Sequence, residues 1–161
     1  MIVVISTTEL RKIIDSIDKH QSSVEVSLDL GISKKTVKLD NSGFCINDVK
    51  IPVKNKIKLR DDDKSCYVIL EGKLSKLQFF SEQTNSLYKL IPTVYRPILK
   101  ISGTSMHKKT FLDRIEADKL TGHILDTGTG LGYSSIIEAK TADSVTTIEI
   151  DENVIEMARF N

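Results

Sequence analysis

His123-Ile-Leu-Asp-Thr-Gly-Thr-Gly-Leu-Gly-Tyr133 is the segment from which the fold of this 161-residue chain is best predicted. It begins as a short strand, turns through three glycines and continues into a segment with helical character. A second strand that ends in Thr-Ile-Glu-Ile-Asp151 and a further helix follow. We expect strands at 123–126 and 144–150 and helices at 133–140 and 152–160. This order predicts a βαβ unit with two parallel strands.

The glycine loop is the part of this unit that is expected to carry chemistry. Gly128 and Gly130 allow a sharp turn, and they let backbone amides approach a ligand without a Cβ in the way. The helix that follows adds a partial positive charge at its N-terminus. Glu149 comes 21 positions after Gly128, at the end of the second strand. A carboxylate there can accept hydrogen bonds from ribose hydroxyls, so the pattern predicts a nucleotide-type ligand.

The residues around the loop discriminate between ligands. A dinucleotide-binding loop would carry glycine at position 133, where this chain has Tyr133. The carboxylate of Asp126 would repel a pyrophosphate and attract an ammonium group. S-adenosyl-L-methionine offers an ammonium group, a cationic sulfur and a ribose, and it has no phosphate. The sequence therefore favours S-adenosyl-L-methionine over NAD as the cofactor.

These residues resemble the class I S-adenosylmethionine-dependent methyltransferases. LDTGTGLG at 125–132 is similar to motif I of that family, and TTIEID at 146–151 to the acidic end of its second strand. The resemblance implies that Asp126 serves the amine end of the methionine, that the glycines line the cofactor and that Glu149 binds the ribose. It assigns no catalytic residue. The cofactor-binding residues expected on this basis are Asp126, Thr127, Gly128, Gly130, Gly132 and Glu149.

A narrower resemblance covers more of the chain. The run from Phe80 to His107, followed by LDTGTGLGYSS, is similar to an archaeal group of predicted methyltransferases with an N-terminal β-rich region, sometimes labelled spermine-synthase-like. It implies an incomplete Rossmann-like α/β fold at 101–161. Before it, at 1–100, we expect an N-terminal α+β module that is mostly antiparallel β. Pro92 and Pro97 place the boundary near 92–106.

The N-terminal module has its own local signals. Ser6 and Glu9 form a capping box, and apolar residues at i, i+3, i+4 and i+7 predict a helix at about 7–19. Alternating apolar residues with turn residues between them predict a small antiparallel sheet after it. The two cysteines lack metal-ligand spacing, and Asp61–Asp63 is expected to be a charged turn, so no metal site is predicted.

The charge is divided unevenly. Residues 1–100 carry 17 Lys/Arg against 12 Asp/Glu, whereas residues 101–161 carry 6 against 10. The basic stretch from Lys34 to Arg60 is consistent with RNA binding and equally with a solvated strand face. No apolar run approaches the ~20 residues that span a bilayer, and the N-terminus lacks signal-peptide features. We therefore expect a cytoplasmic protein without membrane contact.

Three functions stay open at this stage. The first is the N-terminal portion of a methyltransferase with an unknown methyl acceptor, inactive and weakly binding by itself because only two strands of the family's larger sheet precede Asn161. A fragment is favoured over a subunit completed by another chain or an oligomer. The second is a spermidine/spermine synthase-like aminopropyltransferase, and the third a non-catalytic RNA- or protein-binding module. His107 could approach the cofactor, but a boundary residue with a satisfied ring nitrogen is the preferred interpretation.

Overall fold

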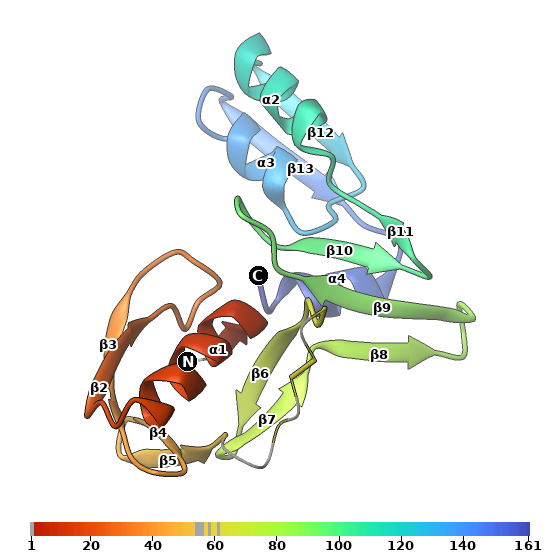
Figure 1. Ribbon diagram of the computed structural model, residues 1–161. Helices are drawn as coiled ribbons and strands as arrows, with labels where there is room; N and C mark the ends of the chain where they lie inside the picture. The colour runs from red at the N-terminus through yellow and green to blue at the C-terminus, as the bar shows by residue number, and fades with distance from the viewer. Residues whose placement is uncertain (1, 54–56, 58, 61) are drawn as a thin grey trace. The chain divides into compact units, whose positions relative to one another are not determined.

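The computed structural model describes residues 2–53, 57, 59–60 and 62–161. Within them the chain forms four small β-sheets and four helices (Figure 1). The chain divides into two compact units: unit 1 is Met1–Leu77 with Ile91–Pro97, and unit 2 is Gln78–Leu90 with Ile98–Asn161. Residues 78–90, which the sequence placed in the first domain, group with the second unit.

Unit 1 consists of one helix and two antiparallel sheets. The first sheet has the order β1-β6-β7 and the second the order β2-β3-β4-β5. The elements are β1 (Val3–Ser6), α1 (Thr7–Asp18), β2 (Ser23–Val26), β3 (Lys35–Leu39), β4 (Gly43–Ile46), β5 (Val49–Pro52), β6 (Cys66–Leu70) and β7 (Lys73–Lys76).

The predicted N-terminal helix is confirmed as α1. The Ser6 hydroxyl accepts a hydrogen bond from the Glu9 backbone N–H at 3.2 Å, as the N-cap should. The Glu9 carboxylate accepts from the Ser27 backbone N–H at 3.2 Å and so ties the first turn of the helix to the chain beyond β2. The apolar stripe of α1 includes Leu10 and Ile13, which are buried in one core with side chains from both sheets. Burial of this stripe is the main stabilisation of the helix.

Unit 2 combines an antiparallel sheet with a parallel strand pair. The antiparallel sheet has the order β11-β10-β9-β8, and the parallel pair is β12-β13. The elements are β8 (Gln78–Ser81), β9 (Ser86–Ile91), β10 (Ile98–Ile101), β11 (Thr104–Ser105), α2 (Lys109–Asp118), β12 (His123–Thr127), α3 (Tyr133–Glu138), β13 (Ser144–Ile148) and α4 (Glu152–Ala158).

The predicted fold class, an incomplete Rossmann-like α/β fold behind an α+β module, is wrong. In the described part of the chain, three of the four sheets are antiparallel. The reason is the turn chemistry. Asn47-Asp48, Glu71-Gly72 and Ser102-Gly103 all have positive φ and join neighbouring strands through two residues. Such turns match the twist of hairpins and return the chain antiparallel. Among the described strands, only β12 and β13 pair in parallel, and an isolated parallel bridge joins Val4 and Asp29.

The strand–loop–helix–strand–helix order around the glycine loop does form locally. β12 pairs with β13 from His123↔Ser144 to Thr127↔Ile148, with α3 in the connection. Parallel strands are usually covered on both faces. Here Leu125 is 60% exposed and Ile148 is 54% exposed. The pair therefore positions the loop without forming a buried sheet.

The expected charged turn at Asp61–Asp63 is confirmed at Asp62, an exposed turn residue, whereas Asp63 belongs to a buried polar network that stabilises unit 1. Asp61 lies outside the described residues, but Asp63 is only 8% exposed. Its carboxylate accepts hydrogen bonds from Ser65 Oγ at 2.6 Å, from Lys76 Nζ at 2.8 Å and from Tyr67 Oη at 3.3 Å. Burial by itself would raise the pKa of Asp63, but the hydrogen bonds from Lys76 and Ser65 outweigh it and hold the pKa below its usual value.

We expect Asp63→Ala to lower the free energy of unfolding at pH 7 by about 1–3 kcal/mol, because it leaves buried donors without an acceptor. Because the pKa of Asp63 is lower in the folded than in the unfolded state, its ionised carboxylate stabilises the folded state at a pH above the unfolded-state pKa. This stabilisation is lost as the pH falls through the folded-state pKa. The difference from wild type should therefore shrink in acid. Urea denaturation at pH 7 and pH 3 measures it. Asp62→Ala is the matched control, because the side chain of Asp62 is 78% exposed. Equal losses in both variants at pH 7 would contradict the role of Asp63.

Candidate functional site

The glycine loop between β12 and α3 is fixed to the end of β13 by its backbone. The N–H groups of Gly128 and Thr129 both donate to the carbonyl of Ile148, at 2.8 and 3.1 Å. Gly128 and Gly130 have φ values of 95° and 55°, in the left-handed region. Glycine adopts this region without the steric cost that other residues incur. These glycines therefore let the chain leave β12, fold back over β13 and enter α3.

Glu149 lies directly against this loop, one residue beyond β13. Its Oε2 accepts a hydrogen bond from the Gly130 N–H at 2.9 Å. Its Oε1 accepts from the backbone N–H groups of Ile150 and Asp151 at 3.0 and 3.1 Å. Charge-assisted bonds of this kind are stronger than neutral ones. The carboxylate has further lone pairs that these bonds do not use. It can therefore accept a hydrogen bond from a ligand hydroxyl while it orders the loop.

Asp126, expected to serve the amine end of the cofactor, is turned toward α3. Its Oδ2 accepts hydrogen bonds from the hydroxyls of Ser134 at 2.8 Å and Ser135 at 2.5 Å. Glu138 of the same helix is buried, and its Oε2 has no hydrogen-bond partner among the described residues. Burial, and secondarily the charge of Asp126, raises the pKa of Glu138. The face between β12 and α3 is thus acidic and unsuited to a phosphate.

The two remaining predicted residues occupy the ends of the loop. Thr127 is the last residue of β12, pairs with Ile148 in register and is exposed. Gly132 has a φ of 82° and caps α3, and its N–H donates to the Thr129 carbonyl at 2.8 Å. The structure therefore brings Gly128, Gly130 and Glu149 together directly. Asp126 bonds on the side of the loop that faces α3.

His107, in the link between β11 and α2, contacts the glycine loop, in agreement with the less favoured interpretation that it could approach the cofactor. A Cβ added to Gly130 would lie 2.3 Å from His107 Cε1, so the imidazole packs on the glycine backbone. The ring also meets Tyr133 edge-on, with centroids 5.4 Å apart. Its Nε2 is buried and has no hydrogen-bond partner in the described part of the chain. The preferred interpretation, a boundary histidine with a satisfied ring nitrogen, is therefore wrong.

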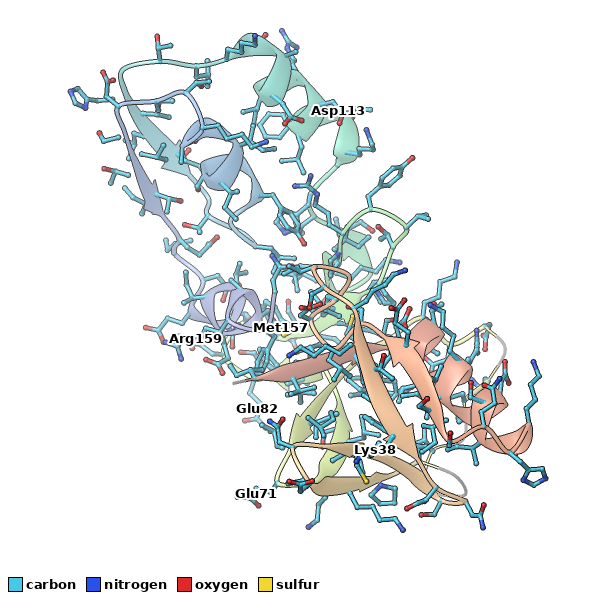
Figure 2. All side chains as sticks on the ribbon, turned by 90° about the vertical axis from the view of Figure 1, so that its left-hand side faces the viewer. Lys38, Glu71, Glu82, Asp113, Met157 and Arg159 are labelled. Carbon is cyan, nitrogen blue, oxygen red and sulfur yellow. The ribbon has the colours of Figure 1, made fainter. Side chains whose placement is uncertain are left out.

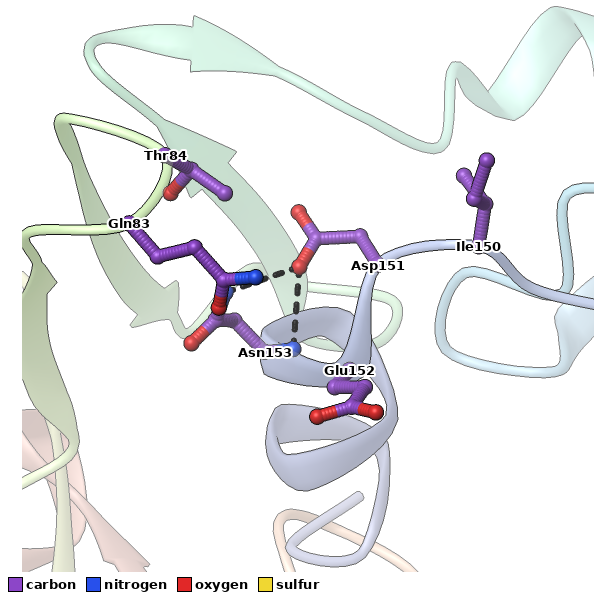
Figure 3. A pocket seen from close by; sticks show the side chains of 6 residues that line it. All are labelled: Gln83, Thr84, Ile150, Asp151, Glu152 and Asn153. Carbon is purple, nitrogen blue, oxygen red and sulfur yellow. Dashed lines mark hydrogen bonds between the residues drawn. The ribbon is translucent and has the colours of Figure 1, made fainter.

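The residues that follow Glu149 in the sequence line part of a pocket. It has a volume of about 390 Å³ and is lined by Gln83, Thr84, Ile150, Asp151, Glu152 and Asn153 (Figure 3). Asp151 accepts hydrogen bonds from the Asn153 side chain at 2.9 Å and from Tyr88 Oη at 2.5 Å. Although burial opposes it, these bonds keep the pKa of Asp151 below its usual value. Ile150 is 97% exposed and offers an apolar surface at the mouth of the pocket.

The basic stretch of unit 1 is partly neutralised. Lys50 pairs with Asp40 at 2.7 Å, and Lys34 with Glu25 at 3.5 Å. The hydrogen bond from Lys50, with help from Ser42, holds the pKa of Asp40 well below its usual range. Lys38 is exposed (Figure 2). Three further lysines of the basic stretch, Lys54, Lys56 and Lys58, lie outside the described residues. RNA binding by this stretch stays a prediction.

Two absences hold for the described residues. They contain no group of three or more His, Cys, Asp or Glu side chains placed to hold a metal ion. None of their helices has the length and apolar character that crossing a bilayer requires.

Comparison with known proteins gives one distant relative. No family model matches the chain. An uncharacterized protein of Methanocaldococcus jannaschii is 29% identical over 160 residues, which cover 90% of this chain and 54% of that protein. The chain thus spans about half the length of the curated relative that it matches. The name of that protein states no activity.

We expect Gly130→Ala to disturb the loop more than Gly128→Ala, although both positions have positive φ. The strain of a positive φ costs on the order of 1–2 kcal/mol at either site. Only the methyl group at 130 would collide with His107, because a Cβ at 128 has no neighbour within 4 Å. Heteronuclear NMR should show large shifts of the His107 ring protons in G130A and small ones in G128A. Similar ring shifts in the two variants would contradict this packing.

Proposed function

We propose that the glycine loop of unit 2 binds S-adenosyl-L-methionine and that the chain is the cofactor-binding portion of a methyltransferase. The observation that carries this proposal is the hydrogen bond from the Gly130 N–H to Glu149. It holds a carboxylate at the loop, one residue before the exposed Ile150, which lines a pocket.

The charges around the loop favour this ligand class. Three carboxylates lie on the loop's flanks, on β12 and just after β13: Asp126, Glu149 and Asp151. Such a surface disfavours pyrophosphate and favours a ligand that is cationic and carries hydroxyls. S-adenosyl-L-methionine has a sulfonium, an ammonium and a ribose. NAD, with its two phosphates, fits the same residues poorly.

Three groups of the ligand, the ribose, the base and the ammonium group, would have a counterpart in the chain. Glu149 is placed to accept a ribose hydroxyl, and Ile150 is exposed where a flat base can lie against it. Asp126, held by two serine hydroxyls, keeps a negative charge near the start of α3. The bound cofactor would supply an electrophilic methyl group, and the residues described here would hold and orient it. The methyl acceptor is not identified, and no described residue is assigned a catalytic role.

The alternatives lead to different ligands. An aminopropyltransferase would use decarboxylated S-adenosylmethionine on the same loop. The basic balance of residues 1–100 disfavours its polyamine substrates. A non-catalytic module would bind neither nucleoside.

NMR titration of the 15N-labelled chain with S-adenosylhomocysteine, the stable product of methyl transfer, tests the proposal. The amides of Gly128, Gly130 and Ile150 should shift, with a dissociation constant of about 0.1–1 mM. Binding should be weak because the strand pair is exposed on both sides of the loop. Glu149→Gln should weaken it about tenfold or more, since the charged acceptor is lost. Glu156→Gln, an exposed acid on α4 that does not line the pocket, is the matched control.

Two results would contradict the proposal. One is the absence of amide shifts at the loop at millimolar ligand. The other is tighter binding of NAD than of S-adenosylhomocysteine to the same amides, because phosphate recognition is what the acidic flanks are expected to prevent. Tighter binding of the decarboxylated cofactor than of S-adenosyl-L-methionine would favour the aminopropyltransferase.

A further inference from the structure

We propose that His107 is a ligand-contacting residue of the nucleoside site, and that its Nε2 accepts a hydrogen bond from a ligand hydroxyl beside Glu149. This proposal rests on the proposed function and extends the site to the link between β11 and α2. That link precedes α2 and the glycine loop in the sequence, and a role of His107 at the cofactor was the less favoured of its two interpretations.

His107 and Glu149 converge on one residue, Gly130. The imidazole packs against Gly130 so closely that a Cβ there would collide with its Cε1 at 2.3 Å and lie 3.3 Å from both ring nitrogens. The Glu149 carboxylate accepts the N–H of the same residue at 2.9 Å. A ligand hydroxyl that reaches Glu149 at this point is therefore adjacent to the imidazole.

The ring is held in place by its neighbours. Tyr133 contacts it edge-on, and Tyr133 Oη in turn donates to Asn161 Oδ1 at 2.6 Å. Asn161 Nδ2 donates to the Leu131 carbonyl at 3.1 Å, which closes a chain of contacts around the loop. His107 itself has a φ of 60°, a strained backbone conformation for a residue with a side chain. Such strain persists where surrounding contacts fix it, and it is frequent at binding sites.

The buried Nε2 of His107, which has no hydrogen-bond partner among the described residues, distinguishes a binding role of this side chain from a packing role. Buried polar atoms almost always have a hydrogen-bond partner. A phenyl ring could pack on Gly130 equally well, without the cost of a buried nitrogen that lacks one. A hydroxyl group of the ligand supplies the missing partner.

The protonation state of His107 fits an acceptor. Burial lowers its pKa, and the nearby charge of Glu149 opposes that effect only in part. The ionisable groups that face the ring in the described part of the chain are Glu149, after β13, and Tyr133, on α3. At neutral pH the imidazole is therefore neutral, with one nitrogen free to accept. Protonation in acid would remove that acceptor and attract the ring to Glu149.

The test is the same NMR titration with S-adenosylhomocysteine, applied to His107→Phe and His107→Gln. The phenyl ring preserves the packing and removes the acceptor, so H107F should weaken binding about five- to tenfold. The amide oxygen of glutamine can take the place of Nε2, so H107Q should recover most of the affinity. Amide spectra without ligand establish that each variant is folded. His123→Gln, at an exposed histidine bonded to Ser144, is the matched control.

The pH dependence of the affinity for S-adenosylhomocysteine separates ligand binding by His107 from a purely structural role, which would not change it. Wild-type affinity should fall as the pH drops through the His107 pKa, which lies below 6.5, and H107Q should lack that step. Wild-type binding with unchanged affinity in H107F would overturn this proposal and leave the proposed function standing. Absence of nucleoside binding to the wild-type chain would overturn both.

Discussion

The hydrogen bond between the Gly130 N–H and the Glu149 carboxylate is the constraint on which the site depends. It joins the middle of the glycine loop to the residue that follows β13, while the N–H groups of Gly128 and Thr129 anchor the start of the loop to the carbonyl of Ile148. One carboxylate therefore orders the loop and supplies its negative charge. Charge-assisted bonds to three backbone donors make this arrangement stable in a region that is otherwise open to solvent.

The parallel pair that carries the loop is small, and its setting explains why the predicted fold class is wrong. β12, α3 and β13 begin at the predicted residues, because a strand, a glycine turn and a helix are specified by short-range signals. The α1 helix follows its Ser6 cap for the same reason. Which sheet dominates the chain is decided by the many hairpins. Their turns, such as Asn47-Asp48, carry positive φ at ordinary polar residues. That conformation is a weak signal in a single sequence.

As with the fold, only part of the candidate site was predictable from the sequence. Glu149 lies against the loop as its distance along the sequence from Gly128 suggested, since parallel strands of equal length bring their ends together. The hydroxyls that hold Asp126 were not indicated, and the approach of His107 to the loop was the less favoured of its two interpretations. Ser134 and Ser135 are common residues at the start of a helix. The position of His107 depends on a link between two elements, and no periodic pattern describes such a link.

The acidic surroundings of the loop unify these observations. Asp126 on one side and Glu149 and Asp151 on the other would disfavour a phosphate and favour a ligand with positive charge and hydroxyl groups, as the proposed function requires. The unpartnered nitrogen of His107 adds a neutral acceptor to this set. The result is a site whose polar groups are arranged before the ligand arrives, which lowers the cost of binding.

A crystal structure of the chain with S-adenosylhomocysteine tests the central claim most directly. The account predicts the nucleoside against the glycine loop, with its ribose hydroxyls within hydrogen-bond distance of Glu149 and its base beside Ile150. A nucleoside bound elsewhere on the chain, or a Glu149 carboxylate that makes no contact with the ribose, would contradict it.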